Sequence, residues 1–150
     1  EITENALPQD PELAMQRISA LRALGVRIAI DDFGMGYSSL ALLSKMPFTR
    51  LKIDRSFVAD SVASKDSMVI VDLIIDLAQN LNLCITAEGI ETLDQAQMLA
   101  VKGADLGQGY FFSKPVDASD ASELVNKTWH EMLSLQENST DSILVRTRHH

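Results

Sequence analysis

The sequence predicts an α/β fold in which parallel strands alternate with helices along one domain. Short runs of branched apolar residues, such as residues 26–30, are typical of strands buried on both faces. Longer segments with helix-capping residues lie between these runs. The 150 residues are 46% apolar and 23% charged, enough for a single globular domain with its own core. Repeated strand–helix units imply parallel strands with right-handed crossovers.

In the first half of the chain the pattern predicts two helices and two strands. Asp10 followed by Pro11 is a helix start, with a capping residue before proline at the first helical position. Gly25 ends this helix. In order, the elements are a helix from residue 11 to 24, a strand at 26–30, a short helix at 38–46 and a strand at 50–53.

In the second half of the chain, the sequence indicates the helix starts more strongly than it indicates the strands. Ser64 is expected to cap a long helix that runs to about residue 81, and Thr92 with Gln95 forms a capping box for a helix ending at Gly103. Strands are predicted at residues 83–87 and, more weakly, at 105–109. The last helix is expected to start at Ser119 or Ser122 and to carry Leu124, Val125, Trp129 and Leu133.

Two architectures fit this order of elements: an open doubly wound sheet, or part of a (β/α)8 barrel. A Gly-x-Gly-x-x-Gly sequence follows none of the predicted strands, which weakens the dinucleotide-binding version of the open sheet. A complete barrel needs about 250 residues, so this chain would form about half of one. Residues 136–150 are polar and predict a poorly ordered tail, in which His149 and His150 are either native or part of a tag.

Composition excludes several functional classes. The formal net charge of −8 opposes binding to a nucleic acid polymer. The single cysteine, Cys84, cannot form an internal disulfide and is expected to be a small buried hydrophobe, which fits a reducing, cytoplasmic location. The chain shows no signal peptide. The most apolar stretch, residues 68–83, is interrupted by Asp72 and Asp76, so it predicts a mostly buried helix and no membrane segment.

Ionisable residues stand at the ends of several predicted strands. They are Asp31, Asp32, Lys52, Asp54 and Glu88, with the polar Gln108 at the weaker strand and Glu1 and Glu4 where a preceding strand would end. Strand carboxyl ends share one face of a parallel barrel, and active sites are found there. Each residue also has a structural interpretation, as a turn former, an ion pair or a helix-dipole partner. Their joint placement favours a common site.

Carboxylates gathered in one cavity raise one another's pKa unless cations separate them. Hard divalent ions such as Mg²⁺ or Mn²⁺ prefer oxygen ligands, and the sequence offers no nearby Cys–His set for zinc. Two such ions are well suited to hydrolysing a phosphodiester, one acting on the attacking water and the other on the leaving oxygen. The charge pattern therefore indicates a metal-dependent hydrolase.

Five segments together resemble the successive motifs of EAL domains. They are residues 1–4 (EITE), 31–40 (DDFGMGYSSL), 51–57 (LKIDRSF), 87–92 (AEGIET) and 108–115 (QGYFFSKP). The resemblance extends over residues 1–135 and implies the C-terminal half of a TIM-like barrel. The Glu-Ala-Leu motif itself and an asparagine ligand belong to the N-terminal half of the family domain, which these residues do not include.

The resemblance also implies an activity and a set of roles. EAL domains hydrolyse cyclic di-GMP to linear pGpG with Mg²⁺ or Mn²⁺ at a two-metal site. Glu1, Asp31 and Asp32 match metal ligands, Glu88 a catalytic glutamate, Lys52 a lysine that contacts the attacking water, and Gln108 and Asp54 site-lining positions. Glu4, Phe33, Gly34 and Gly36 match a mobile loop and its anchor. Met35 departs from the threonine that is common in this loop.

An alternative is a cyclic di-GMP receptor or interaction module that does not turn its ligand over. The family often forms homodimers, and a half barrel would expose two strand edges and an apolar interior. We therefore expect either a homodimer or association with the missing barrel half.

Overall fold

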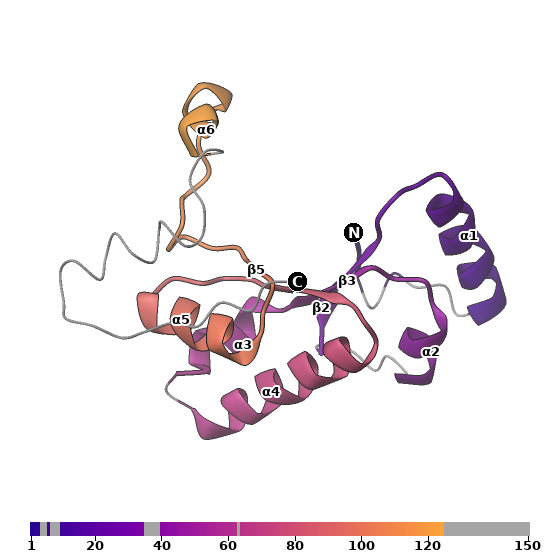
Figure 1. The fold of residues 1–150 in the computed structure, drawn as a ribbon, viewed down its shortest axis with the longest axis horizontal. Coiled ribbons are helices and arrows are strands. Elements are labelled where there is room, and N and C mark those ends of the chain that lie inside the picture. The colour runs from indigo at the N-terminus through magenta and orange to yellow at the C-terminus, as the bar shows by residue number, and fades with distance from the viewer. Residues whose placement is uncertain (4–5, 7–9, 35–39, 63, 125–150) are drawn as a thin grey trace.

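A five-stranded parallel sheet, with its strands in chain order, forms the centre of the molecule (Figure 1). The computed structural model describes residues 1–3, 6, 10–34, 40–62 and 64–124. The strands are β1 (Ile2–Thr3), β2 (Ala29–Phe33), β3 (Arg50–Ile53), β4 (Cys84–Ala87) and β5 (Leu106–Gly107). The prediction of an α/β fold with parallel strands is confirmed.

The helices are α1 (Pro11–Ala23), α2 (Leu40–Lys45), α3 (Arg55–Asp60), α4 (Lys65–Asn80), α5 (Leu93–Lys102) and α6 (Ala118–Leu124). Three of the helices, α1, α4 and α5, begin at the caps that the sequence predicts. Asp10 accepts the backbone N–H groups of Glu12 and Leu13, and Ser64 accepts that of Ser67. Thr92 and Gln95 form the complete capping box of α5. Each cap satisfies N–H groups that the helix itself leaves free.

The sheet has an apolar face and a polar face. In the register of β3 with β4, Leu51 pairs with Ile85 and Ile53 with Ala87, and all four side chains are fully buried. Because side chains alternate along a strand, the paired residues between them, Arg50 with Cys84 and Lys52 with Thr86, lie on the opposite face. We call the first set the apolar face and the second set the polar face.

Helices α3, α4 and α5 lie together on one side of the sheet (Figure 1). Val71, Ile74, Ile75 and Ala78 form the buried stripe of α4, at the spacing of a helix that packs on one side only. On the other side of α4, Leu73 is 63% exposed. The prediction of a mostly buried helix is therefore wrong for α4, which is amphipathic.

Other sequence predictions differ from the structure in detail. Strand β2 starts three residues later than expected and includes Asp31, Asp32 and Phe33, which were placed after it. Helix α3 was not predicted. Helix α6 begins at Ala118, so neither Ser119 nor Ser122 is its cap. The rest of the predicted last helix, from Val125 on, and the polar tail at 136–150 lie outside the described residues.

The expectations for the cysteine and for membrane segments can also be compared with the structure. Cys84 is partly exposed on the polar face, so the prediction of a buried hydrophobe is wrong for this thiol. In the part of the chain that the structure describes, every helix is too short or too polar to cross a bilayer.

Candidate metal-binding active site

Lys52 lies at the centre of a cluster of carboxylates on the polar face. Its Nζ is 3.0 Å from Glu1 Oε2, 3.0 Å from Asp31 Oδ1 and 2.7 Å from Glu88 Oε1. Burial of Lys52 lowers its pKa, but hydrogen bonds to the three carboxylates outweigh this effect, and the net pKa is raised. The raised pKa favours the protonated lysine, which donates hydrogen bonds to these carboxylates.

A β-bulge at Asp31 and Asp32 brings two consecutive aspartates to the same site. Ile30 pairs with Leu51 and Phe33 with Ile53, so β2 has one more residue than β3 between these pairs. Asp32 takes up the extra residue with a φ of 52°, in the left-handed region that Asp tolerates better than most residues. Its backbone N–H donates to Asp31 Oδ1 at 3.1 Å. Regular alternation would have sent the two carboxylates to opposite faces.

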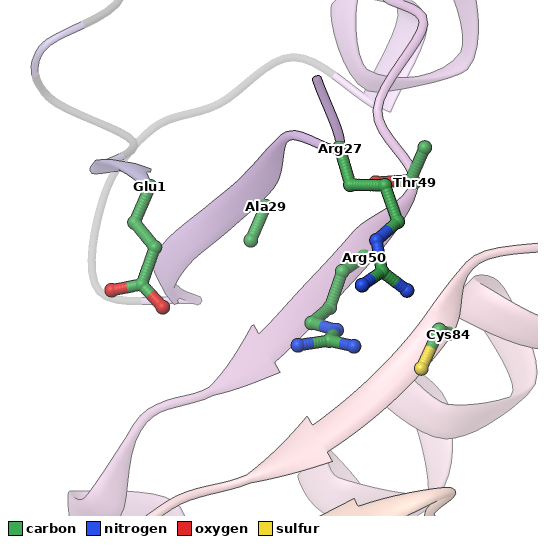
Figure 2. Close-up of a pocket in the computed structure, with 6 residues that line it drawn as sticks. All are labelled: Glu1, Arg27, Ala29, Thr49, Arg50 and Cys84. Atoms are coloured by element: carbon green, nitrogen blue, oxygen red, sulfur yellow. The ribbon is translucent and has the colours of Figure 1, made fainter. Parts of the chain in front are cut away.

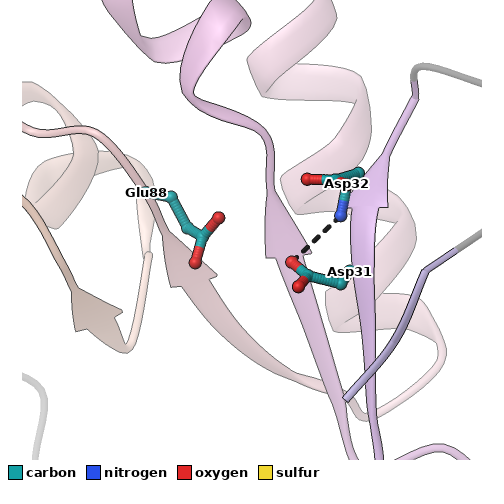
Figure 3. Close-up of side chains that lie close together, drawn as sticks. All are labelled: Asp31, Asp32 and Glu88. Atoms are coloured by element: carbon teal, nitrogen blue, oxygen red, sulfur yellow. Dashed lines mark hydrogen bonds between the residues drawn. The ribbon is translucent and has the colours of Figure 1, made fainter.

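Asp31, Asp32 and Glu88 form a group that fits a divalent cation (Figure 3). One oxygen from each carboxylate lies within 4.8 Å of the others. Loss of some hydration, together with the charges of Asp31 and Asp54, raises the pKa of the exposed Asp32. Crowded carboxylate oxygens of this kind suit a hard ion such as Mg²⁺ or Mn²⁺, because such an ion removes the repulsion between them.

Close backbone packing fixes the segment that carries Glu88. Its N–H donates to the Ile53 carbonyl at 3.2 Å, which continues the β3–β4 pairing past the strand end. The next residue, Gly89, has a φ of 68°, and a Cβ there would lie 2.4 Å from Arg55 Cβ. Only glycine fits this position. The start of α3 and the end of β4 are thus in contact, and this contact holds Glu88 toward Lys52.

Asp54 and Gln108 lie at strand ends but outside the Lys52 ion pairs. Asp54 caps α3 and accepts the Ser56 N–H at 2.8 Å. Partial burial raises the pKa of Asp54, but hydrogen bonds from Ser56 and the charge of Arg55 lower it more, and the net pKa is below its usual value. Gln108 is exposed, and its backbone bonds to Ala87 and Ile90.

The first two residues of the predicted mobile loop lie at the end of β2 and in the turn that follows it. Phe33 is the last residue of β2 and is buried in the core, while Gly34 follows in a turn with a φ of 101°. Met35, Gly36 and Glu4 lie outside the described residues.

Two features of the polar face were missed from the sequence. Thr86, in register with Lys52, is 6% exposed, and its Oγ1 has no hydrogen-bond partner among the described residues. A pocket at the amino ends of β2, β3 and β4 is lined by Glu1, Arg27, Ala29, Thr49, Arg50 and Cys84 (Figure 2). A signal in the sequence could have revealed both features, because residues two apart on a strand lie on the same face. This spacing relates Arg50 to Lys52, and it also relates Cys84, Thr86 and Glu88.

The structure brings together residues that are far apart in the sequence. Glu1, Asp31 and Glu88 share one lysine, and Asp32 joins Asp31 and Glu88. The carboxylates converge as predicted, but Glu1 precedes β1 and does not follow the end of a strand as expected. The carboxylates outnumber the single buried lysine, so the site has an excess of negative charge that a cation can neutralise.

Comparisons with known proteins agree with this geometry. The family model described as EAL domain matches residues 1–115. The cyclic di-GMP phosphodiesterase NbdA of Pseudomonas aeruginosa is 44% identical over 125 residues, which cover 83% of this chain and 15% of NbdA. The oxygen sensor protein DosP of Escherichia coli is 40% identical over 120 residues, covering 80% of this chain and 15% of DosP.

Solved structures give the same result. The EAL domain of Mycobacterium smegmatis DcpA superposes with a TM-score of 0.77 at 42% identity, over 82% of this chain and 55% of that domain. The PaMucR phosphodiesterase in its c-di-GMP complex gives a TM-score of 0.76 at 39% identity, over 80% of this chain and 49% of PaMucR. The chain thus spans about half of these structures, which are TIM-barrel-like. This chain belongs to the EAL domain family, as shown by the family match and by these superpositions, with which its parallel sheet and acidic cluster agree.

Proposed function

We propose that this chain provides the carboxyl-end half of an active site that hydrolyses cyclic di-GMP to linear pGpG with Mg²⁺ or Mn²⁺. The observation that carries the proposal is the convergence of Glu1, Asp31 and Glu88 on the buried Lys52, with Asp32 beside them. Names of relatives support it, since NbdA is a cyclic di-GMP phosphodiesterase and PaMucR was solved with c-di-GMP.

Glu1, Asp31 and Asp32 are the proposed metal ligands. Their carboxylates come from the amino-terminal segment and from the bulge of β2, and Asp31 and Asp32 are close enough to share one ion with Glu88. Divalent ions supply Lewis acidity at the phosphate and lower the pKa of water. The bulge holds the two aspartates in a fixed relation before any ion binds, which reduces the cost of assembling the site.

Glu88 and Lys52 are the proposed catalytic residues. The Glu88 carboxylate is held 2.7 Å from the lysine ammonium, and this contact fixes its orientation. We assign to Glu88 the acceptance of a proton from the attacking water. Lys52 remains protonated, so it orients that water and offsets negative charge that develops on the phosphate oxygens.

The remaining predicted residues have positions that suit supporting roles. We propose that Gln108 and Asp54 border the substrate at the ends of β5 and β3. Phe33 and Gly34 would form the base of the substrate loop, with Gly36 inside it and Glu4 as its anchor. The functional unit is proposed to extend over residues 1–135, with 136–150 as a tail. A cytoplasmic location stays a prediction.

The direct test is hydrolysis of cyclic di-GMP. The assay compares this chain alone with the same chain joined to the amino-terminal half of the DcpA EAL domain. We expect pGpG from the joined protein in Mg²⁺ or Mn²⁺, and its loss with EDTA. We expect little or no product from the chain alone, because part of the ligand set lies in the other half.

Other outcomes would contradict parts of the proposal. Saturable binding of cyclic di-GMP without product, in a joined protein that melts cooperatively, would support the receptor interpretation instead. Efficient hydrolysis by residues 1–150 alone would show that the site does not need the other half. Activity that survives EDTA would exclude the metal assignment.

A further inference from the structure

The pocket on the polar face lies at the amino ends of β2, β3 and β4 and shares one residue, Glu1, with the acidic cluster. Its volume is about 320 Å³. Arg27 precedes β2 and Arg50 opens β3, and both guanidinium groups lie among the residues that line the pocket (Figure 2). Asp31, Asp32 and Glu88, by contrast, stand at or beyond the carboxyl ends of the strands. The two arginines therefore lie at the amino end of the polar face, and the three carboxylates Asp31, Asp32 and Glu88 lie at its carboxyl end.

Neither guanidinium has a counter-ion among the described residues. The buried Lys52 is paired with three carboxylates, and Lys102 of α5 is paired with Asp72 of α4. Within the same residues, Arg27 and Arg50 contact no carboxylate within salt-bridge distance, although Glu1 lines the same pocket. In a chain with a net charge of −8, two unpaired arginines in one pocket are a distinctive feature.

We propose that Arg27 and Arg50 bind a carboxylate from the polypeptide that covers the polar face, namely the amino-terminal half of an EAL barrel. Covering this face would desolvate Arg50, which already lies half-buried on the middle strand of the sheet. A guanidinium removed from water needs a partner, and a carboxylate matches its two parallel donors.

The comparisons favour polypeptide as the occupant. This chain spans 55% of the DcpA EAL domain with a TM-score of 0.77, so the remainder of such a domain is available to cover this face. Interiors of TIM-like barrels are filled by layers of side chains from alternate strands. A pocket at the amino ends of β2, β3 and β4 corresponds to the lowest of these layers. An inward-pointing Asp or Glu from the other half is the occupant whose charge fits.

The test uses Cys84, which lines the same pocket and is the chain's single cysteine. The chain is mixed with the separately expressed amino-terminal half of the DcpA EAL domain, in which any cysteine is replaced by serine. We expect the two to co-elute from size-exclusion chromatography. The rate at which neutral N-ethylmaleimide modifies Cys84 should fall at least about tenfold in the complex, because the thiol becomes covered.

Charge-reversal variants link this complex to the arginines. Arg27→Glu with Arg50→Glu should weaken association at least about tenfold and restore the labelling of Cys84. Arg50→Lys keeps the positive charge but loses the planar guanidinium, so its affinity for the other half should lie between those of the wild type and the double variant. Arg17→Glu on α1 reverses one charge away from the pocket, half the change of the double variant, and should have no effect. A thermal melt of each variant separates loss of binding from loss of folding.

Four results would overturn the proposal. The first is failure of the wild-type halves to associate, and the second is equal binding by the folded Arg27→Glu/Arg50→Glu variant. The third is protection of Cys84 by inorganic phosphate or acetate alone, which would make the pocket a site for a free anion. The fourth is a dimer of this chain alone with Cys84 protected, which would make a second copy the occupant. Hydrolysis is not measured, so the proposed function stands or fails separately.

Discussion

The two faces of the sheet differ most clearly at neighbouring residues of β3. Leu51 is fully buried on the apolar face, where only packing against other side chains is required. Lys52, the next residue, is almost as buried but needs three carboxylates from distant segments. The apolar face is stabilised by any side chain of suitable shape and volume, whereas the polar face works only with a particular set of partners.

The comparison also separates what each face contributes. The apolar face packs against α4 and its neighbouring helices and is the source of most of the fold's stability. The polar face concentrates charge, which is costly to bury and is retained where chemistry requires it. We therefore expect substitutions on the apolar face to change the free energy of unfolding, and substitutions on the polar face to change activity.

The largest expected effect is on turnover. In the joined EAL domain, Glu88→Gln should lower the rate of pGpG formation by about 100-fold or more, because it removes the proposed proton acceptor. The thermal midpoint should change little, since the substitution keeps the shape of the side chain. Glu91→Gln is the matched control, because Glu91 is exposed and outside the cluster. Full activity of the Glu88 variant would remove its catalytic role.

On the apolar face the effect should appear in stability. Leu51→Ala should lower the free energy of unfolding of this chain by about 2–5 kcal/mol, as expected when a fully buried side chain leaves a cavity. Denaturation by urea, followed by circular dichroism, measures the change. Val101→Ala, at a position that is 76% exposed, should change it by less than about 0.5 kcal/mol. Equal losses in the two variants would contradict the assignment of the core.

Asp54 follows the last residue of β3 and caps α3, and substituting it should have a smaller effect. Asp54→Ala removes the cap of α3 and should cost about 1 kcal/mol, while Asp54→Asn should keep most of the capping. Because the pKa of Asp54 is lowered by folding, its ionised form adds stability above its usual pKa of about 4. This part is lost as pH falls through the lowered pKa.

Urea midpoints of wild type and Asp54→Asn, measured from pH 6 down to pH 3, would test the sign of this effect. The gap between the two proteins should narrow as the solution becomes more acidic. A gap that widens instead would mean that the Asp54 carboxylate is destabilising in the folded state.

The smallest effect is expected at Thr86, which is on the polar face but buried like a core residue. Thr86→Val replaces a hydroxyl that has no hydrogen-bond partner among the described residues by a methyl group of similar shape, and should stabilise the chain by up to about 1 kcal/mol. Ser61→Ala is the contrasting variant. The Ser61 hydroxyl donates a hydrogen bond to the Val58 carbonyl at 2.7 Å, so its removal should lower the free energy of unfolding. A Thr86→Val variant that is stable but loses turnover would place this hydroxyl in the active site.

Much of the architecture could be predicted from the sequence because it depends on near neighbours. The caps at Asp10, Ser64 and Thr92 act within three residues of the helix start, and apolar runs identify β2, β3 and β4, whereas the two-residue strand β1 was not predicted. The order of strands and helices implied parallel pairing, and strand ends predicted where carboxylates would gather. Helix α3 was missed because its six residues have no strong apolar periodicity.

The site itself depended on tertiary structure. The sequence determined which acidic residues follow which strands, since this is a property of order along the chain. Only packing decided that one extra residue in β2 turns Asp31 and Asp32 to the same side, and that Lys52 meets Glu1 and Glu88. It also decided that Arg27 and Arg50 line one pocket. These contacts join segments far apart in the chain, and their geometry follows from strand register and burial, which local sequence does not specify.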